Sequence, residues 1–261
     1  SIVGDEPSLI VNTAGAAMAV CPNRIQAITT LLNAYPDLQL IIADDGLQHY
    51  ALQRDIEWIV VDASRGFGNQ QLLPTGFLRE PMSRLKGANV IYHEKANRTT
   101  TDNKKAQSNR LTMHLQADKL QPLWPSAVEI DDLTVAAKMP MPPMPNSRVH
   151  AVSGIGYPQR FFDTLASLGF DVVGHAYPDH YDFSLSELLQ YTQQPIIVTS
   201  KDAVKIKALL IDATRGQPLS EEYQELVNRL WVLPVTAVLS DSCYANLQQQ
   251  LKALNIDITT G

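Results

Sequence analysis

The stretch from Leu38 to Tyr50, LQLIIADDGLQHY, limits the possible folds of this chain most strongly. Its apolar run at 38–42 is too short for a helix and rich in branched side chains, so it predicts a buried strand. In an open α/β sheet, ligands bind at the carboxyl ends of such strands. We therefore expect Asp44 and Asp45 at a ligand-binding edge, with Gly46 allowing a sharp turn after the strand.

Two interpretations of these acids stay open on this stretch alone. Asp-Asp-Gly is an ordinary turn sequence, and a turn needs no function. In nucleotide enzymes, however, an acid in this position holds Mg²⁺ against the phosphates, directly or through water. Gln48 and His49 follow directly and would add polar groups to such a site.

The neighbouring segments predict a parallel sheet with covering helices. Asn23 is a suitable N-cap for a helix that keeps its apolar period as far as Tyr35, where a proline follows. Two more strands are predicted at 56–62 and 88–93. Strands that alternate with helices and turns in this order are typical of an α/β fold.

A second α/β unit is predicted further along the chain. Residues 94–109 have the composition of a surface connection, 110–123 predict a short hairpin, and 139–146, with four prolines, predict an extended linker. Beyond the linker, the predicted strands are 149–153, 170–175, 195–200 and 230–235, and the predicted helices are 159–168, one capped by Ser184 or Ser186, and 244–254.

Composition excludes several classes of protein. With 261 residues, 45% of them hydrophobic, the chain can build one large core or two modest ones. A net charge of −6 argues against a broad nucleic-acid surface. Cys21 and Cys243 form no metal or redox motif, which favours a reducing compartment. No apolar run approaches the length of a membrane span.

Charge is clustered in two other segments. Arg65, Arg79 and Arg84 lie in one loop region rich in glycine and proline, and guanidinium groups suit phosphate recognition. Simple solvation of surface arginines is the alternative. Gly4-Asp5-Glu6-Pro7 places two acids before a proline and, taken alone, predicts a solvated turn.

Several short motifs lie along the chain: Val3-Gly4-Asp5-Glu6-Pro7, Asp44 to Tyr50 with Leu52, Arg54 and Asp55, Arg65 to Asn69, Leu72 to Pro74, Leu78 to Pro81, Gly154-Ile155-Gly156, Arg160 to Phe162, Pro178-Asp179-His180 and Lys201-Asp202-Ala203-Val204-Lys205. Taken together, these motifs resemble the tetraacyldisaccharide 4′-kinase family of lipid A synthesis. Each motif is short, but their order and spacing along the chain are specific to the family.

The resemblance implies a fold with a P-loop NTPase-like parallel sheet lobe and a second, smaller α/β lobe. The expected division is an incomplete nucleotide-binding lobe at 1–95, a connection with hairpin and linker at 96–147, and a C-terminal lobe at 148–261. The implied reaction moves the γ-phosphate of ATP, with Mg²⁺, to the 4′-hydroxyl of an acylated glucosamine disaccharide 1-phosphate. The implied location is the cytoplasmic face of a Gram-negative inner membrane, where the enzyme is peripheral or anchored by an N-terminal segment.

The resemblance also implies roles for individual residues. Asp44 and Asp45 would organise Mg²⁺, Asp5 would act as the base for the sugar hydroxyl, and His180 would pair with Asp5. Other matching positions carry no individual role: Glu6, Arg79 and Glu80 are expected to bind substrate, and Gln48 and His49 to bind nucleotide or acceptor.

This chain departs from the family pattern at four positions: Asn23, where the family usually has Asp, Gln70 (Gly), Tyr157 (Asn) and Tyr181 (His). In addition, no Gly-x-x-x-x-Gly-Lys-Ser/Thr motif occurs in the 261 residues. The resemblance places that phosphate loop, and a membrane-associating helix, before Gly4. We therefore expect a piece that lacks both and has no useful kinase activity by itself.

The sequence leaves two other classes of function open. A module that binds lipid or nucleotide without turnover would agree with the absence of a phosphate-loop motif. A zinc hydrolase would use residues such as His175, Asp179, His180 and Asp182, but their spacing matches no recognised zinc-ligand pattern.

Overall fold

The computed structural model describes residues 4–94, 110–124, 140–214 and 218–256. These form two compact units. Unit 1 comprises Ser1–Met18 and Ala117–Val235, and unit 2 comprises Ala19–Gln116 and Thr236–Gly261. Both are built from helices and mainly parallel strands, which confirms the expected α/β class.

Unit 1 is a five-stranded sheet. Its strands are ordered β4 (Gln121–Pro122), β8 (Leu230–Leu233), β7 (Ile196–Thr199), β5 (Arg148–Ser153) and β6 (Asp171–Ala176). The pairs β8–β7, β7–β5 and β5–β6 are parallel, and only the edge strand β4 runs antiparallel to its neighbour. Its helices are α1 (Asp5–Ala14), α3 (Gln159–Ser167), α4 (Leu185–Leu189), α5 (Ser200–Ala213) and α6 (Glu221–Val227).

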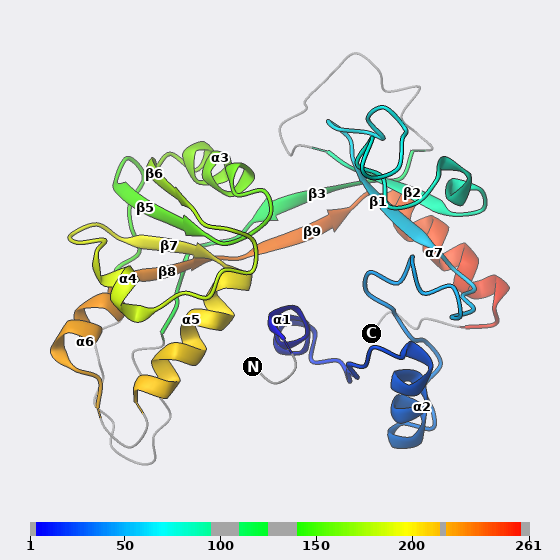
Figure 1. The fold of residues 1–261 in the computed structure, drawn as a ribbon, viewed down its shortest axis with the longest axis horizontal. Coiled ribbons are helices and arrows are strands. Elements are labelled where there is room, and N and C mark those ends of the chain that lie inside the picture. The colour runs from blue at the N-terminus through cyan, green and yellow to red at the C-terminus, as the bar shows by residue number, and fades with distance from the viewer. Residues whose placement is uncertain (1–3, 95–109, 125–139, 215–217, 257–261) are drawn as a thin grey trace. The chain divides into compact units, whose positions relative to one another are not determined.

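Helices cover both faces of this sheet (Figure 1). On one face, Val149 and Ala151 of β5 pack with Phe161 and Leu165 of α3. On the other, Val152 packs in a cluster with residues of α4, α5 and α6. Burial on both faces explains why the strand sequences are continuously apolar instead of alternating with polar residues.

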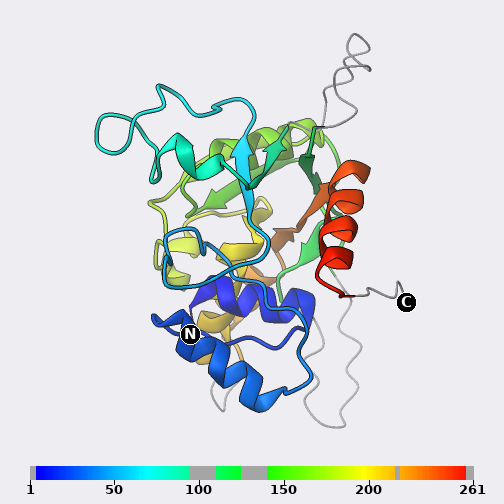
Figure 2. The same ribbon diagram turned by 90° about the vertical axis from the view of Figure 1, so that its right-hand side faces the viewer.

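Unit 2 is a four-stranded sheet. Its strands are ordered β1 (Trp58–Asp62), β2 (Asn89–His93), β3 (Thr112–Ala117) and β9 (Val235–Leu239), and β1–β2 and β2–β3 are parallel. Its helices are α2 (Arg24–Ala34), the 3₁₀ helix η1 (Met82–Leu85) and α7 (Asp241–Ala253). Helix α7, red in Figures 1 and 2, follows β9 and contacts the sheet where the Cys243 thiol donates to the Thr112 carbonyl at 3.4 Å.

Two predicted helix caps are confirmed. Asn23 caps α2 by accepting hydrogen bonds from the backbone N–H groups of Ile25 and Gln26. Ser184 and Glu187 form a reciprocal capping box at the start of α4. Of the described helices, none is long and apolar enough to cross a membrane.

The predicted buried strand at 38–42 is wrong. These residues form no regular structure, and Ile42 keeps 86% of its surface exposed. A strand is stabilised by hydrogen bonds to a neighbouring strand, and no described strand pairs with this segment. The turn after it does form at Asp44 and Asp45.

The predicted hairpin at 110–123 is also wrong. Strand β3 pairs in parallel with β2, whereas β4 pairs with β8, so the two strands belong to different sheets. The last predicted strand ends before Pro234, after which β9 joins β3 in unit 2. For this reason the two units are not contiguous in sequence and differ from the expected division at residues 95 and 148.

The Gly-Asp-Glu-Pro segment begins a helix where the residues alone predicted a turn. Pro7 is tolerated because it lies in the first turn of α1, where the backbone N–H has no partner within the helix. The helix ends at Gly15, which adopts the left-handed backbone conformation (φ 62°) that favours glycine.

Candidate active site

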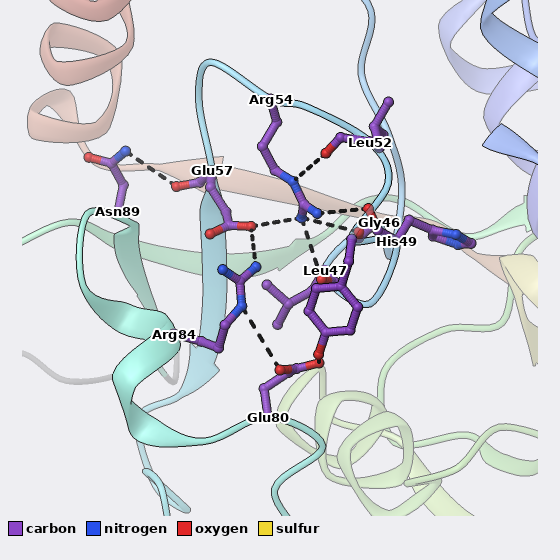
Figure 3. Close-up of polar contacts among 10 residues, drawn as sticks. Gly46, Leu47, His49, Leu52, Arg54, Glu57, Glu80, Arg84 and Asn89 are labelled. Carbon is purple, nitrogen blue, oxygen red and sulfur yellow. Dashed lines mark hydrogen bonds and ion pairs between the residues drawn. The ribbon is translucent and has the colours of Figure 1, made fainter. Parts of the chain in front are cut away.

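In unit 2, one arginine holds the loop that directly follows Asp44 and Asp45, from Gly46 to His49 (Figure 3). Arg54 donates hydrogen bonds to the carbonyl oxygens of Gly46 and His49, at 3.2 and 3.0 Å, and to the Glu57 carboxylate at 2.8 Å. A guanidinium presents several donors in one plane, so a single side chain can fix several carbonyls. Arg54 therefore fixes the backbone that follows the two aspartates.

Replacing Arg54 should destabilise this turn. We expect Arg54→Met to lower the free energy of unfolding of unit 2 by about 1–3 kcal/mol, because the Glu57 carboxylate loses a charged donor. Arg54→Lys should restore little of it, since an ammonium lacks the planar fork. Urea unfolding followed by the fluorescence of Trp58 measures the change, with Lys86→Met as the exposed control. Equal stability of Arg54→Met and the control would contradict this role.

A second arginine extends the network to Glu80 (Figure 3). Arg84 donates to Glu57 at 3.1 Å, and its Nε lies 3.9 Å from Glu80. The Tyr50 hydroxyl also donates to Glu80, and this hydrogen bond raises the pKa of Tyr50 above its ordinary value. Glu80 thus supports the loop in this structure, and its substrate-binding role stays a prediction.

The structure brings together three of the predicted residues. Arg79 forms two near-parallel contacts with the Asp45 carboxylate, 3.1 Å from Nη1 and 3.2 Å from Nη2. Its Nη2 also donates to the Gln48 side-chain oxygen. Asp45 itself adopts a left-handed backbone (φ 45°), a sparsely populated conformation for residues other than glycine.

The donor set of this turn fits a magnesium ion bound together with a nucleotide. No group of three or more metal-binding side chains occurs within the described ranges. Mg²⁺ held with nucleotide phosphates, however, takes only one or two protein carboxylates and several waters. Asp44 and Asp45 are exposed on the same turn and can supply them.

In unit 1, His180 follows β6, and Glu6 of α1 contacts Lys201 at the start of α5, directly after β7. Strands β5 and β7 are parallel neighbours, and the helices that follow them, α3 and α5, pack on opposite faces. The chain places β6 on one side of β5 and β7 on the other, so the direction in which strands are added to the sheet reverses between β5 and β7. In α/β sheets, ligands bind at the carboxyl edge beside such a reversal.

A buried carboxylate joins the two strand ends. Asp202 is fully buried, and its Oδ2 accepts hydrogen bonds from the Gly154 N–H at 3.2 Å and the Thr199 hydroxyl at 2.7 Å. A Cβ atom at Gly154 would lie 3.2 Å from Asp202 Oδ1, so the close approach favours glycine. Burial raises the pKa of Asp202, with the hydrogen bonds from Thr199 and Gly154 opposing it.

This raised pKa predicts a pH dependence of stability. The folded state binds the Asp202 proton more tightly than the unfolded state, so its contribution to stability is complete below the ordinary pKa of 3.8 and falls as pH rises through the folded pKa. Asp202→Asn should therefore flatten the fall in unfolding free energy above about pH 4. Urea titrations at several pH values test this, with the exposed Asp212→Asn as control. An unchanged slope would contradict it.

His180 lies on a strained turn that contacts the loop at Gly154. Its backbone is left-handed (φ 59°), and its N–H donates to Gly154 O at 3.2 Å and to Asp179 Oδ1 at 3.0 Å. The imidazole Nε2 lies 3.9 Å from Asp179 Oδ2. Such conformations persist where surrounding contacts hold them, and they are concentrated at functional sites.

Glu6 reaches this region through Lys201. The Lys201 ammonium lies 3.0 Å from Glu6 Oε1 and 3.6 Å from Asp179 Oδ1. Asp5 is the first residue of α1, but its side chain lies outside the described part of the structure. The pairing of Asp5 with His180 therefore stays a prediction.

The zinc alternative gains no support from the structure. His175 lies within β6, and its Nε2 is 2.9 Å from His150 Nδ1 on the neighbouring strand. Burial lowers the pKa of both histidines. Neither belongs to a described group of three potential metal ligands.

The sequence motifs alone indicate no role for Arg54, Lys201 or Asp202, although all three lie in motifs that the family shares. Charged residues next to the ends of apolar strands could have indicated a role for these side chains. The motifs do not show, however, which distant residue each charge contacts.

The comparisons with known proteins cover nearly the whole chain. A family model described as tetraacyldisaccharide-1-P 4′-kinase matches residues 1–252. The chain belongs to the tetraacyldisaccharide 4′-kinase family. It is 70% identical to the "Tetraacyldisaccharide 4'-kinase" of Psychrobacter cryohalolentis over 263 residues, which cover 99% of this chain and 70% of that relative.

Other family members are similar at two levels. The protein of the same name from Psychrobacter arcticus is 69% identical over 272 residues, covering 100% of this chain and 70% of that relative. The one from Stutzerimonas stutzeri is 40% identical over 206 residues, which cover 78% of this chain and 56% of that relative. No solved structure matches the chain. The two clusters described above therefore belong to a member of a lipid kinase family.

Proposed function

We propose that this protein catalyses the ATP-dependent phosphorylation of the 4′-hydroxyl of a tetraacylated glucosamine disaccharide 1-phosphate, in lipid A synthesis. The main support is the 70% identity to a curated 4′-kinase along 99% of the chain. The acceptor is a lipid, so we infer that the protein acts at the cytoplasmic face of the inner membrane.

The turn in unit 2 is proposed to serve the phosphate end of ATP. Asp44 and Asp45 would hold Mg²⁺, which supplies charge neutralisation on the phosphates. Arg79 already binds the Asp45 carboxylate through two nitrogen atoms, and the same fork geometry suits a phosphate. Gln48 and His49 belong to the same turn and would complete contacts to nucleotide or acceptor.

The cluster in unit 1 is proposed to serve the acceptor hydroxyl. Phosphoryl transfer depends mainly on positioning and charge, but the hydroxyl must lose its proton as it attacks. Asp5 would accept that proton at a carboxylate oxygen, and His180 would orient Asp5. Glu6 lies next to Asp5 in the same turn of α1 and would bind acceptor, as would Glu80 in unit 2.

The test measures transfer of labelled phosphate from [γ-³²P]ATP to the disaccharide acceptor by the intact gene product. We expect label on the normal acceptor and none on an acceptor analogue that lacks the 4′-hydroxyl. Binding of the acceptor in isothermal titration without any transfer would instead support a non-catalytic lipid-binding module. Equal labelling of both acceptors would contradict the proposed position of transfer.

A further inference from the structure

We propose that Lys201 is a positioning residue that ties the Gly-Asp-Glu-Pro segment of α1 to the Pro-Asp-His turn after β6. Its motif, Lys201 to Lys205, is not explained by the roles proposed above. The inference rests on the proposed function, because the residues that Lys201 would align are Asp5 and His180.

The position of Lys201 in its helix first suggests this role. It is the second residue of α5, and the N-terminus of a helix carries partial positive charge, which disfavours a cation. Two carboxylates offset this cost. The Lys201 ammonium lies 3.0 Å from Glu6 and 3.6 Å from Asp179, with only 18% of its side chain exposed.

The protonation of Lys201 agrees with this geometry. Burial lowers the pKa of the ammonium, but the ion pairs with Glu6 and Asp179 outweigh burial and leave the pKa above its ordinary value. Lys201 is therefore charged at neutral pH, and both contacts persist there.

The second partner of Lys201 connects it to His180. Asp179 Oδ1 accepts from the His180 backbone N–H at 3.0 Å, and the same oxygen faces Lys201. A Cβ atom at Gly156 would lie 3.3 Å from Asp179 Oδ2, so the glycine lets the loop after β5 approach this carboxylate. A continuous path of contacts thus runs from Glu6 through Lys201 and Asp179 to the backbone of His180.

The first partner of Lys201 connects it to the start of α1. Glu6 follows Asp5 directly, and α1 contacts α5. Fixing Glu6 restricts where the Asp5 backbone can lie. Because small misplacements of reacting groups cost large factors in rate, loss of this link should lower turnover more than substrate affinity.

Steady-state kinetics of the intact gene product test the catalytic part. We expect Lys201→Met to lower kcat by on the order of 10- to 100-fold with little change in KM for ATP. Lys201→Arg, which keeps the charge, should restore most of the loss, and Lys207→Met, on an exposed position of the same helix, should behave as wild type. In a His180→Ala background, Lys201→Met should lower kcat by a smaller factor than in the wild type, because only the link to Asp5 is then lost.

Three kinetic outcomes would overturn the inference. A raised KM with unchanged kcat would mean that Lys201 contacts a substrate. Strictly additive losses with His180→Ala would mean that it acts independently of the Pro-Asp-His turn. Equal losses of kcat in Lys201→Arg and Lys201→Met would mean that the positive charge of Lys201 does not matter for turnover.

Hydrogen exchange tests the link without any activity. Amides of α1 should exchange faster than in the wild type, by on the order of 3- to 10-fold, in Lys201→Met and in Glu6→Gln. The double variant should exchange no faster than either single variant, because both substitutions break the same contact. Amides of β5 and β7 should be unaffected. Unchanged exchange in α1 would overturn the link even in an active kinase, whereas absence of phosphate transfer by the wild type would overturn only the proposed function.

Discussion

Asp5→Asn should lower kcat by ~10²–10⁴-fold in the intact gene product, with little change in KM for ATP. The sugar hydroxyl must lose its proton during attack on the γ-phosphate, and an amide cannot accept that proton. Steady-state phosphate transfer at saturating acceptor measures the loss, and circular dichroism confirms that the variant is folded. A nearly wild-type Asp5→Asn would remove Asp5 as the base.

The partner residue should depend on Asp5. If His180 orients the Asp5 carboxylate, His180→Ala should cost less than Asp5→Asn, and the double variant should be barely worse than Asp5→Asn alone. The His180 backbone is fixed by Gly154 O and Asp179 Oδ1, so the substitution removes the imidazole from a turn held by other contacts. Additive losses would leave His180 with a separate role.

Asp44→Asn or Asp45→Asn should weaken the dependence of the rate on Mg²⁺. We expect at least one of the two to lose on the order of a hundredfold or more in rate, because a metal ion neutralises charge that develops on the phosphates. Mg²⁺ titrations of activity, and direct Mg²⁺-dependent ATP binding, measure the effect.

The contact between Asp45 and Arg79 supplies a matched control. Arg79→Met removes the cation from the Asp45 carboxylate but leaves both acids on the turn. It should therefore preserve the Mg²⁺ dependence that Asp45→Asn loses. Unchanged Mg²⁺ titrations in both aspartate variants would mean that Asp-Asp-Gly is an ordinary turn that does not bind the metal.

Elements that depend on neighbouring residues were predictable from the sequence alone. The cap at Asn23 and the box of Ser184 with Glu187 form as predicted, because each joins groups only two or three positions apart. The apolar strands of unit 1 were recognisable because burial on both faces leaves a continuous run. The order and spacing of the motifs also sufficed to indicate the family.

Which segments pair with one another depends instead on the tertiary structure. The apolar run at 38–42 has the composition of a strand, yet a strand also requires a neighbour, and none of the described strands pairs with it. Likewise, Pro234 separates β8 from β9, and the two strands join different sheets. The contact between Lys201 and Glu6 spans most of the chain. Such pairings depend on the whole path of the backbone, which short-range patterns do not contain.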